Sequence, residues 1–365
     1  MTAPFRLYGA ELSPYSVKLR SYLRYKGVPF EWLQRSEARK DEFQRYAKQP
    51  LVPVLVDADD AAMQDSTLIM EKLETEFPEP SIVPEEPSLA FVSALLEDYA
   101  DEWLNKAMFH YRWSYPEDQE SAARRIVEML FEDAEAPQDI ADSVRTRMIA
   151  RLHHVGSSPE TAPVIEGSFA RTIVLLDKLV SSRTYLLGER PSMADFGLAG
   201  QFRQMLSDPT PGALLTAQSP NLVHWIERME APADKGGFAS FEAVRGDLIP
   251  LLREELAGAY LPWMAANAHA VDDDAPSVRV EIAGQLFTQK PQRYAAKAFA
   301  EIKRKRAALG DDTLAALLLE TGCEAFLALP DANGPSEAVL ETDAEDDGEI
   351  EGGEAAGGAG SESED

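Results

Sequence analysis

The first 80 residues alternate short apolar runs with apolar stripes at helical spacing. Strands are predicted at residues 5–8, 30–33, 54–56 and 62–64. Helices are predicted between Pro14 and Gly27, within residues 35–49, and where Ile69, Leu73 and Phe77 recur every four residues. This βαβαββα order predicts a small mixed sheet with helices on both of its faces, an α/β domain at residues 1–80.

A proline-dense linker, with four prolines between residues 78 and 87, ends this first region because proline cannot continue a helix. The pattern then becomes helical, with apolar faces over residues 92–103 and 169–180. Ser192 and Asp195 are spaced like a capping box at a helix start, with Asp in place of the usual Glu. Residues 88–231 are therefore predicted to form an all-helical domain.

Residues 232–330 are predicted to form an added, mostly helical unit. Apolar helices are expected at 250–268 and 313–329, a strand pair at 278–282 and 286–288, and a basic helix at 294–308. The remaining 331–365 are rich in Gly, Ala and acidic residues and hold too little apolar surface to offset the entropy of ordering. We expect them to be a disordered acidic tail.

Charge and composition exclude several classes of function. Net charge is −28, and residues 331–365 alone carry 13 acidic and no basic side chains. A surface this negative repels phosphate backbones, so nucleic acid is not expected as a partner. No apolar run approaches the ~18 residues of a membrane span. The N-terminus also lacks a basic segment followed by an apolar stretch, which favours a cytoplasmic location.

The cysteine and histidine counts limit metal and redox chemistry. A single cysteine, Cys323, excludes an intramolecular disulfide, a CxxC redox pair and a cysteine-based zinc site. The five histidines are scattered without metal-ligand spacing, so no metal is expected.

Candidate chemistry lies at two helix starts. Ser13, between the first strand and Pro14, has a hydroxyl that could stabilise a thiolate at the positive end of a helix. Taken alone, it equally fits an ordinary N-cap followed by proline. At the second helix start, Ser66 could hold a carboxylate and Gln64 or Asp65 an ammonium group, although Asp65 and Ser66 also fit simple caps.

A third element is the pair Val52-Pro53 at the entry to a strand, where proline is uncommon. A cis Val52-Pro53 bond would turn the Val52 backbone outward, so that it could pair with an extended peptide. An ordinary edge-strand proline is the alternative.

The order of Ser13-Pro14-Tyr15-Ser16, then Val52-Pro53-Val54-Leu55, then Gln64-Asp65-Ser66-Thr67 resembles the glutathione-transferase superfamily. The resemblance spans residues 5–230. It implies a thioredoxin-like domain followed by an all-α domain, with glutathione as co-substrate and no other cofactor. A hydrophobic electrophile as second substrate, a homodimer and a role in detoxification are implied by the same resemblance.

Carried onto this sequence, the resemblance assigns Ser13 to the thiolate, Val52 and Pro53 to the cysteinyl backbone, and Gln64, Asp65 and Ser66 to the γ-glutamyl end of glutathione. Ser16 and, more weakly, Tyr8 are rivals to Ser13. Candidates for the glycine carboxylate are Lys40, Lys48 and Gln49. Tyr111, Trp113 and Tyr115 either border the electrophile or belong to the core.

The expected function is therefore a glutathione transferase that conjugates the thiolate to an electrophilic small molecule. The first rival is a non-catalytic interaction module with the same fold, since fold does not determine function. The second is a glutathione-dependent reductase or peroxidase, which is disfavoured because both cysteines of a Cys-Pro-Tyr-Cys motif are serine here.

Overall fold

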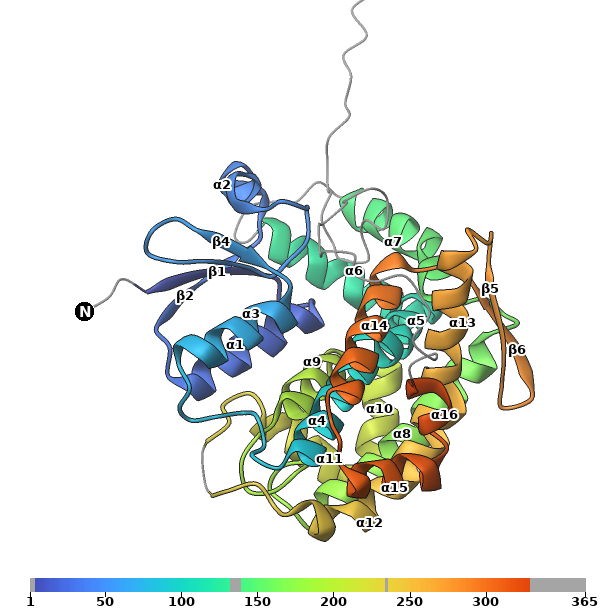
Figure 1. Cartoon of the computed structure of the whole chain (residues 1–365). Helices are drawn as coiled ribbons and strands as arrows, with labels where there is room; N and C mark the ends of the chain where they lie inside the picture. The colour runs from blue at the N-terminus through green and yellow to red at the C-terminus, as the bar shows by residue number, and fades with distance from the viewer. Residues whose placement is uncertain (1–3, 132–138, 234–235, 329–365) are drawn as a thin grey trace, which may run out of the picture.

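The structure is a computed structural model, and it describes residues 4–131, 139–233 and 236–328. The predicted acidic tail at 331–365 lies outside the described residues. Figure 1 shows the N-terminal sheet and its helices on one side of the molecule and a larger group of helices on the other.

The N-terminal region has the predicted βαβαββα order. Its elements are β1 (Phe5–Gly9), α1 (Pro14–Lys26), β2 (Phe30–Gln34), a 3₁₀ turn (Glu37–Arg39), α2 (Lys40–Tyr46), β3 (Val54–Val56), β4 (Ala62–Gln64) and α3 (Ser66–Glu76). The strands lie in the order β2-β1-β3-β4, with β1 and β2 parallel and the other pairs antiparallel. The expected mixed sheet is confirmed.

Alternation along the strands gives the sheet two buried faces. Leu7 and Leu55 pack with the α1 and α3 side chains, whereas Tyr8, Val54 and Val56 belong to a second cluster with Phe43 of α2. Accordingly, α1 and α3 lie side by side on one face and α2 covers the other (Figure 1).

The second region is all-helical, as predicted. It consists of α4 (Pro87–Tyr99), a π-helical turn (Ala100–Leu104), α5 (Asn105–Ser114), α6 (Pro116–Phe131), α7 (Ile140–Ala150), a 3₁₀ turn (Leu152–Val155), α8 (Ala162–Val180), α9 (Met193–Ser207), α10 (Pro209–Gln218) and α11 (Pro220–Arg228). The expected capping box opens α9, where the buried Asp195 accepts from the Ser192 backbone N–H at 2.8 Å and from the Trp225 indole N–H at 3.1 Å.

The chain then continues through α12 (Phe241–Leu251), a π-helical segment (Leu252–Tyr260), α13 (Leu261–Asp272), β5 (Val278–Ile282), β6 (Gln285–Gln289), α14 (Arg293–Ala307), α15 (Asp312–Thr321) and α16 (Glu324–Leu327). The strand pair and the basic helix were predicted. The final helix was predicted as one element, but Gly322 adopts a left-handed φ of 85° and ends α15, so α16 is separate.

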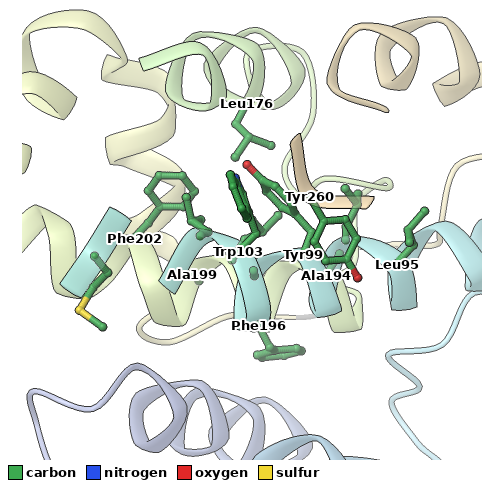
Figure 2. Close-up of a cluster of buried hydrophobic side chains, with 14 of the residues drawn as sticks. Leu95, Tyr99, Trp103, Leu176, Ala194, Phe196, Ala199, Phe202 and Tyr260 are labelled. Carbon is green, nitrogen blue, oxygen red and sulfur yellow. The ribbon is translucent and has the colours of Figure 1, made fainter. Parts of the chain in front are cut away.

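One continuous apolar core joins these regions. Figure 2 shows Tyr260, from the π-helical segment before α13, packed beside Tyr99 and Trp103 of the second region. On the opposite side of this cluster, Phe196 of α9 points toward α1, where its ring meets Tyr22 at 5.7 Å (Figure 2). The helical region therefore fixes the position of α1, the helix that begins beside Ser13.

Candidate functional site

Three segments that carry the predicted site residues leave the sheet at the same end. Tyr8 near the end of β1, Val54 at the start of β3 and Gln64 at the end of β4 are direct cross-strand partners. The loop to Ser13 follows β1, the Val52-Pro53 pair precedes β3, and Asp65 follows β4. The register therefore brings the three predicted motifs to one edge of the domain.

Ser13 caps α1. Its backbone is extended (φ −94°, ψ 120°), and its hydroxyl oxygen accepts from the Ser16 backbone N–H at 3.2 Å, with Pro14 in the first turn. The side chain is almost completely buried. The helical region holds the preceding loop, because Arg112 donates to the Leu12 carbonyl at 3.0 Å and Gln204 donates to the Glu11 carbonyl at 2.9 Å.

The two rivals of Ser13 face the protein interior. Ser16 is fully buried, and within the part of the chain that the structure describes its Oγ has no hydrogen-bond partner. Tyr8 is buried against α2 and donates its hydroxyl to Glu42 at 2.6 Å. Ser13 is thus the hydroxyl that lies at the helix start itself.

The Val52-Pro53 bond is cis, and Val52 is buried just before β3. The preceding loop is fixed by the Gln64 amide. Its Nε2 donates to the carbonyls of Leu51 and Gln49 at 2.9 and 3.0 Å, and its Oε1 accepts from the backbone N–H of Lys48 and Gln49 at 2.7 and 3.2 Å. These four bonds make Gln64 a positioning residue for the loop.

Asp65 has the unusual backbone angles φ 78° and ψ 110°, in the region that non-glycine residues rarely adopt. Its Oδ1 caps α3 by accepting from the Thr67 and Leu68 N–H groups at 3.0 and 3.2 Å. Ser66, the first residue of α3, is buried. The carboxylate and the positive end of α3 therefore lie next to each other, as binding of an amino-acid head group requires.

A buried ion cluster joins the two helix starts to the helical region. Lys18 of α1 donates to the Thr67 hydroxyl of α3 at 2.9 Å, contacts Asp101 at 2.6 Å and also binds Glu97. Burial opposes the lysine charge, but the two carboxylates raise its pKa above the ordinary value. Burial raises the pKa of Asp101 to about 7, against the attraction of Lys18.

The candidates for a glycine carboxylate gather at one cavity. Lys40, Lys48 and Gln49 line a space of about 170 Å³ beside α2, together with Arg35. One acidic residue, Glu37, also lines the space, but the cationic side chains outnumber it, so the space suits an anionic group.

The three candidate aromatics are placed mainly in the core. Tyr111 and Trp113 are buried, and Tyr111 stacks on Tyr115 with ring centroids 5.5 Å apart. Tyr115 is half-buried and donates its hydroxyl to Glu166 at 2.7 Å.

Sequence reasoning missed two residues at this edge. A lysine is rarely fully buried without a partner, and the carboxylate partners of Lys18, Glu97 and Asp101, lie 79 and 83 positions away in the sequence. Tyr294 of α14 donates its hydroxyl to Asp65 Oδ2 at 2.5 Å, although 229 positions separate the two residues. Local pattern cannot indicate a contact of that sequence separation.

No three His, Cys, Asp or Glu side chains are arranged to hold a metal ion within residues 4–131, 139–233 and 236–328. In the same part of the chain, no helix is long and apolar enough to cross a membrane.

A thioredoxin-like sheet domain followed by a helical domain, with the three motifs at one edge, defines the class of protein. Residues 7–81 match the family model of the glutathione S-transferase N-terminal domain, and residues 142–228 match that of the C-terminal domain. The chain belongs to the glutathione S-transferase superfamily.

Three relatives, each less than 25% identical, show the similarity. The isoprene-epoxide–glutathione S-transferase of Rhodococcus sp. (strain AD45) is 24% identical over 234 residues, which cover 61% of this chain and 94% of the relative. Among solved structures, a glutathione S-transferase of Methylobacterium radiotolerans in complex with glutathione sulfonate is 22% identical, with a TM-score of 0.43 and coverage of 65% and 97%. The β-etherase LigF of Sphingobium sp. strain SYK-6 is 18% identical, with a TM-score of 0.47 and coverage of 67% and 99%.

Proposed function

We propose that this chain binds glutathione at the edge formed by Ser13, Val52 and Asp65 and transfers its thiolate to an electrophilic carbon. The observation that carries the proposal is the register of Tyr8, Val54 and Gln64, which brings the three motifs to one end of the sheet. The family membership supports glutathione as the ligand.

Each part of the peptide has a matching group. The γ-glutamyl ammonium pairs with the Asp65 carboxylate, and the γ-glutamyl carboxylate lies at Ser66 on the positive end of α3. The backbone of Val52, beside Pro53, pairs with the cysteinyl unit. Gln64 acts indirectly, by holding the loop before Val52. The glycine carboxylate lies toward the cavity lined by Lys40, Lys48 and Gln49.

The chemistry is that of a stabilised thiolate. Capping by Ser13 uses an oxygen lone pair, whereas donation to sulfur uses the hydroxyl proton, so one residue can fill both roles. This donation and the positive end of α1 lower the pKa of the bound thiol. The thiolate then forms a sulfur–carbon bond. With an epoxide, the carbon–oxygen bond breaks and the alkoxide takes a proton from water. Proximity supplies the remaining rate enhancement.

The family resemblance also leads us to propose a hydrophobic electrophile, a homodimer and a cytoplasmic role in detoxification. An epoxide is the first electrophile to test, because the Rhodococcus relative is named for one.

The test is calorimetric titration of glutathione into the full chain, together with conjugation assays on an epoxide and an aryl chloride. We expect binding and turnover in the wild type. In Asp65→Asn, which keeps the cap and removes the charge, affinity falls by about tenfold or more. Asp59→Asn, in an exposed turn of the same domain, is the matched control.

Binding without turnover on either electrophile would instead support the non-catalytic interaction module. Absence of glutathione binding in the wild type would exclude the proposed function altogether.

A further inference from the structure

Helix α14 of the C-terminal extension reaches the proposed glutathione site. Tyr294, in its first turn, donates to Asp65, and farther along the same helix Lys305 forms an ion pair with Glu71 of α3 at 2.7 Å. The helix packs against α4, and Figure 1 shows it in orange beside that helix. The extension is therefore held across the start of α3 by at least two polar contacts.

The Asp65 carboxylate divides its two oxygens between two tasks. Oδ1 accepts the backbone N–H groups that begin α3, and Oδ2 accepts the hydroxyl of Tyr294. A ligand ammonium group at Asp65 would use Oδ2, because Oδ1 already serves the cap. In the free protein the Tyr294 hydroxyl thus occupies one of the two lone-pair positions of Oδ2 at which an ammonium group would bind.

The charges around this hydroxyl favour a cation over a phenol. Burial of the hydroxyl and the negative charges of Asp65, Glu102 and Asp101 raise the pKa of Tyr294 well above its ordinary value. The phenol is therefore neutral, and the carboxylate that it contacts is that of Asp65. The bond from the hydroxyl to the carboxylate has one charged partner, whereas an ammonium group adds a second, opposite charge to the contact.

Tyr294 can leave this position without opening the core. The residue is 53% exposed although its hydroxyl end is enclosed beside Asp65. The buried residues of α14 are Ala295, Phe299 and Ile302. A rotation of the tyrosine about χ1 would break the bond to Asp65 and leave the packed face of the helix in place.

We propose that Tyr294 is a specificity-determining residue of the thiol site, whose hydroxyl occupies Asp65 Oδ2 and is displaced by the free α-amino group of the peptide. This proposal rests on the proposed function. A peptide without a free amino group cannot displace the hydroxyl through an ion pair. Tyr294 therefore lowers the affinity for glutathione itself and leaves the affinity for an N-acylated analogue unchanged.

The experiment compares full-length wild type, Tyr294→Phe and Lys305→Met by calorimetry with glutathione and N-acetylglutathione. Tyr294→Phe keeps the ring and removes the competing hydroxyl, so glutathione should bind about tenfold more tightly. Affinity for N-acetylglutathione should not change. Lys305→Met removes the other contact to α3 and should leave both affinities as in the wild type.

Unchanged or weaker glutathione binding by Tyr294→Phe would overturn the proposal. An equal gain in affinity for N-acetylglutathione would also overturn it, and so would an equal gain in glutathione affinity in Lys305→Met. Either result would reflect looser docking of the extension. If the wild type binds glutathione and only the comparison fails, the proposed function stands. If the wild type does not bind glutathione, both proposals fall.

Discussion

The Gln64 side chain holds the carbonyl of Leu51, the residue directly before Val52, at 2.9 Å from its Nε2. The same amide makes three further bonds to the backbone of Lys48 and Gln49. A glutamine that was expected to touch the ligand is thus fully engaged in fixing the loop that leads to the cis Val52-Pro53 pair.

Replacing Gln64 should therefore weaken ligand binding without removing any group that touches the ligand. Gln64→Met keeps the size of the side chain and loses all four bonds. We expect the free energy of unfolding to fall by about 1–2 kcal/mol and glutathione affinity to fall by about tenfold. Urea denaturation and calorimetry measure the two effects. Gln218→Met, at the exposed end of α10, is the control. Equal losses of stability and of glutathione affinity in the two variants would contradict the positioning role of Gln64.

Variants of Ser13 should separate capping from thiolate stabilisation. Ser13→Asp keeps an acceptor for the Ser16 N–H but places a negative charge beside sulfur, so conjugation should be lost although the cap is kept. Ser13→Ala should cost about 1 kcal/mol of stability, depress turnover and raise the pKa of the bound thiol. The pH dependence of kcat/KM for the electrophile, measured at saturating glutathione so that the thiol is already bound, reports that pKa.

Ser16→Ala is the matched control for these variants. It removes a buried hydroxyl that has no hydrogen-bond partner among the described residues, so turnover should change little. If Ser13→Ala and Ser16→Ala affect turnover equally, or neither does, Ser13 loses its assigned role.

The N-terminal elements could be predicted because their signals are local. Gly27, with a left-handed φ of 63°, ends α1 where the sequence placed its end, and the Ser192–Asp195 box opens α9 as expected. The bond between Tyr294 and Asp65 could not be predicted, because it depends on how α14 packs across regions far apart in sequence. Gln64 illustrates a different limit: the sequence marked the residue but could not show which groups its amide would bind.

Lys18 stabilises the junction between the two domains. Lys18→Met would leave Glu97 and Asp101 buried without their cation, so the free energy of unfolding at pH 7 should fall by about 3–5 kcal/mol. The loss should be smaller near pH 5, where the carboxylates take up protons more readily. Lys72→Met, which breaks the exposed pair of Lys72 with Glu76, is the control and should cost about 0.5 kcal/mol or less. A small effect of Lys18→Met at pH 7 would show that the buried pair contributes little.

Glu255 should make stability depend on pH in the opposite sense to a typical salt-bridged carboxylate. It is fully buried between α8 and the extension, where it accepts from Arg171 at 2.6 Å and from Ser168. Burial raises its pKa to about 7, although these two partners oppose the rise. In the range between the ordinary pKa and 7, the folded protein therefore binds more protons than the unfolded chain. Its contribution to stability is complete below the ordinary value and is lost as pH rises through 7.

Between pH 5 and pH 8, the contribution of Glu255 to the free energy of unfolding should thus fall by about 2 kcal/mol. Glu255→Gln keeps an acceptor for Ser168 and Arg171 and cannot titrate, so urea denaturation of this variant should show a correspondingly shallower decline with pH. Because the net charge is −28, many other acidic groups also destabilise the protein as pH rises. The difference between the slopes of the wild-type and Glu255→Gln curves isolates the contribution of Glu255. Parallel curves for wild type and Glu255→Gln would show that Glu255 is already ionised at pH 5 and that Arg171 outweighs burial.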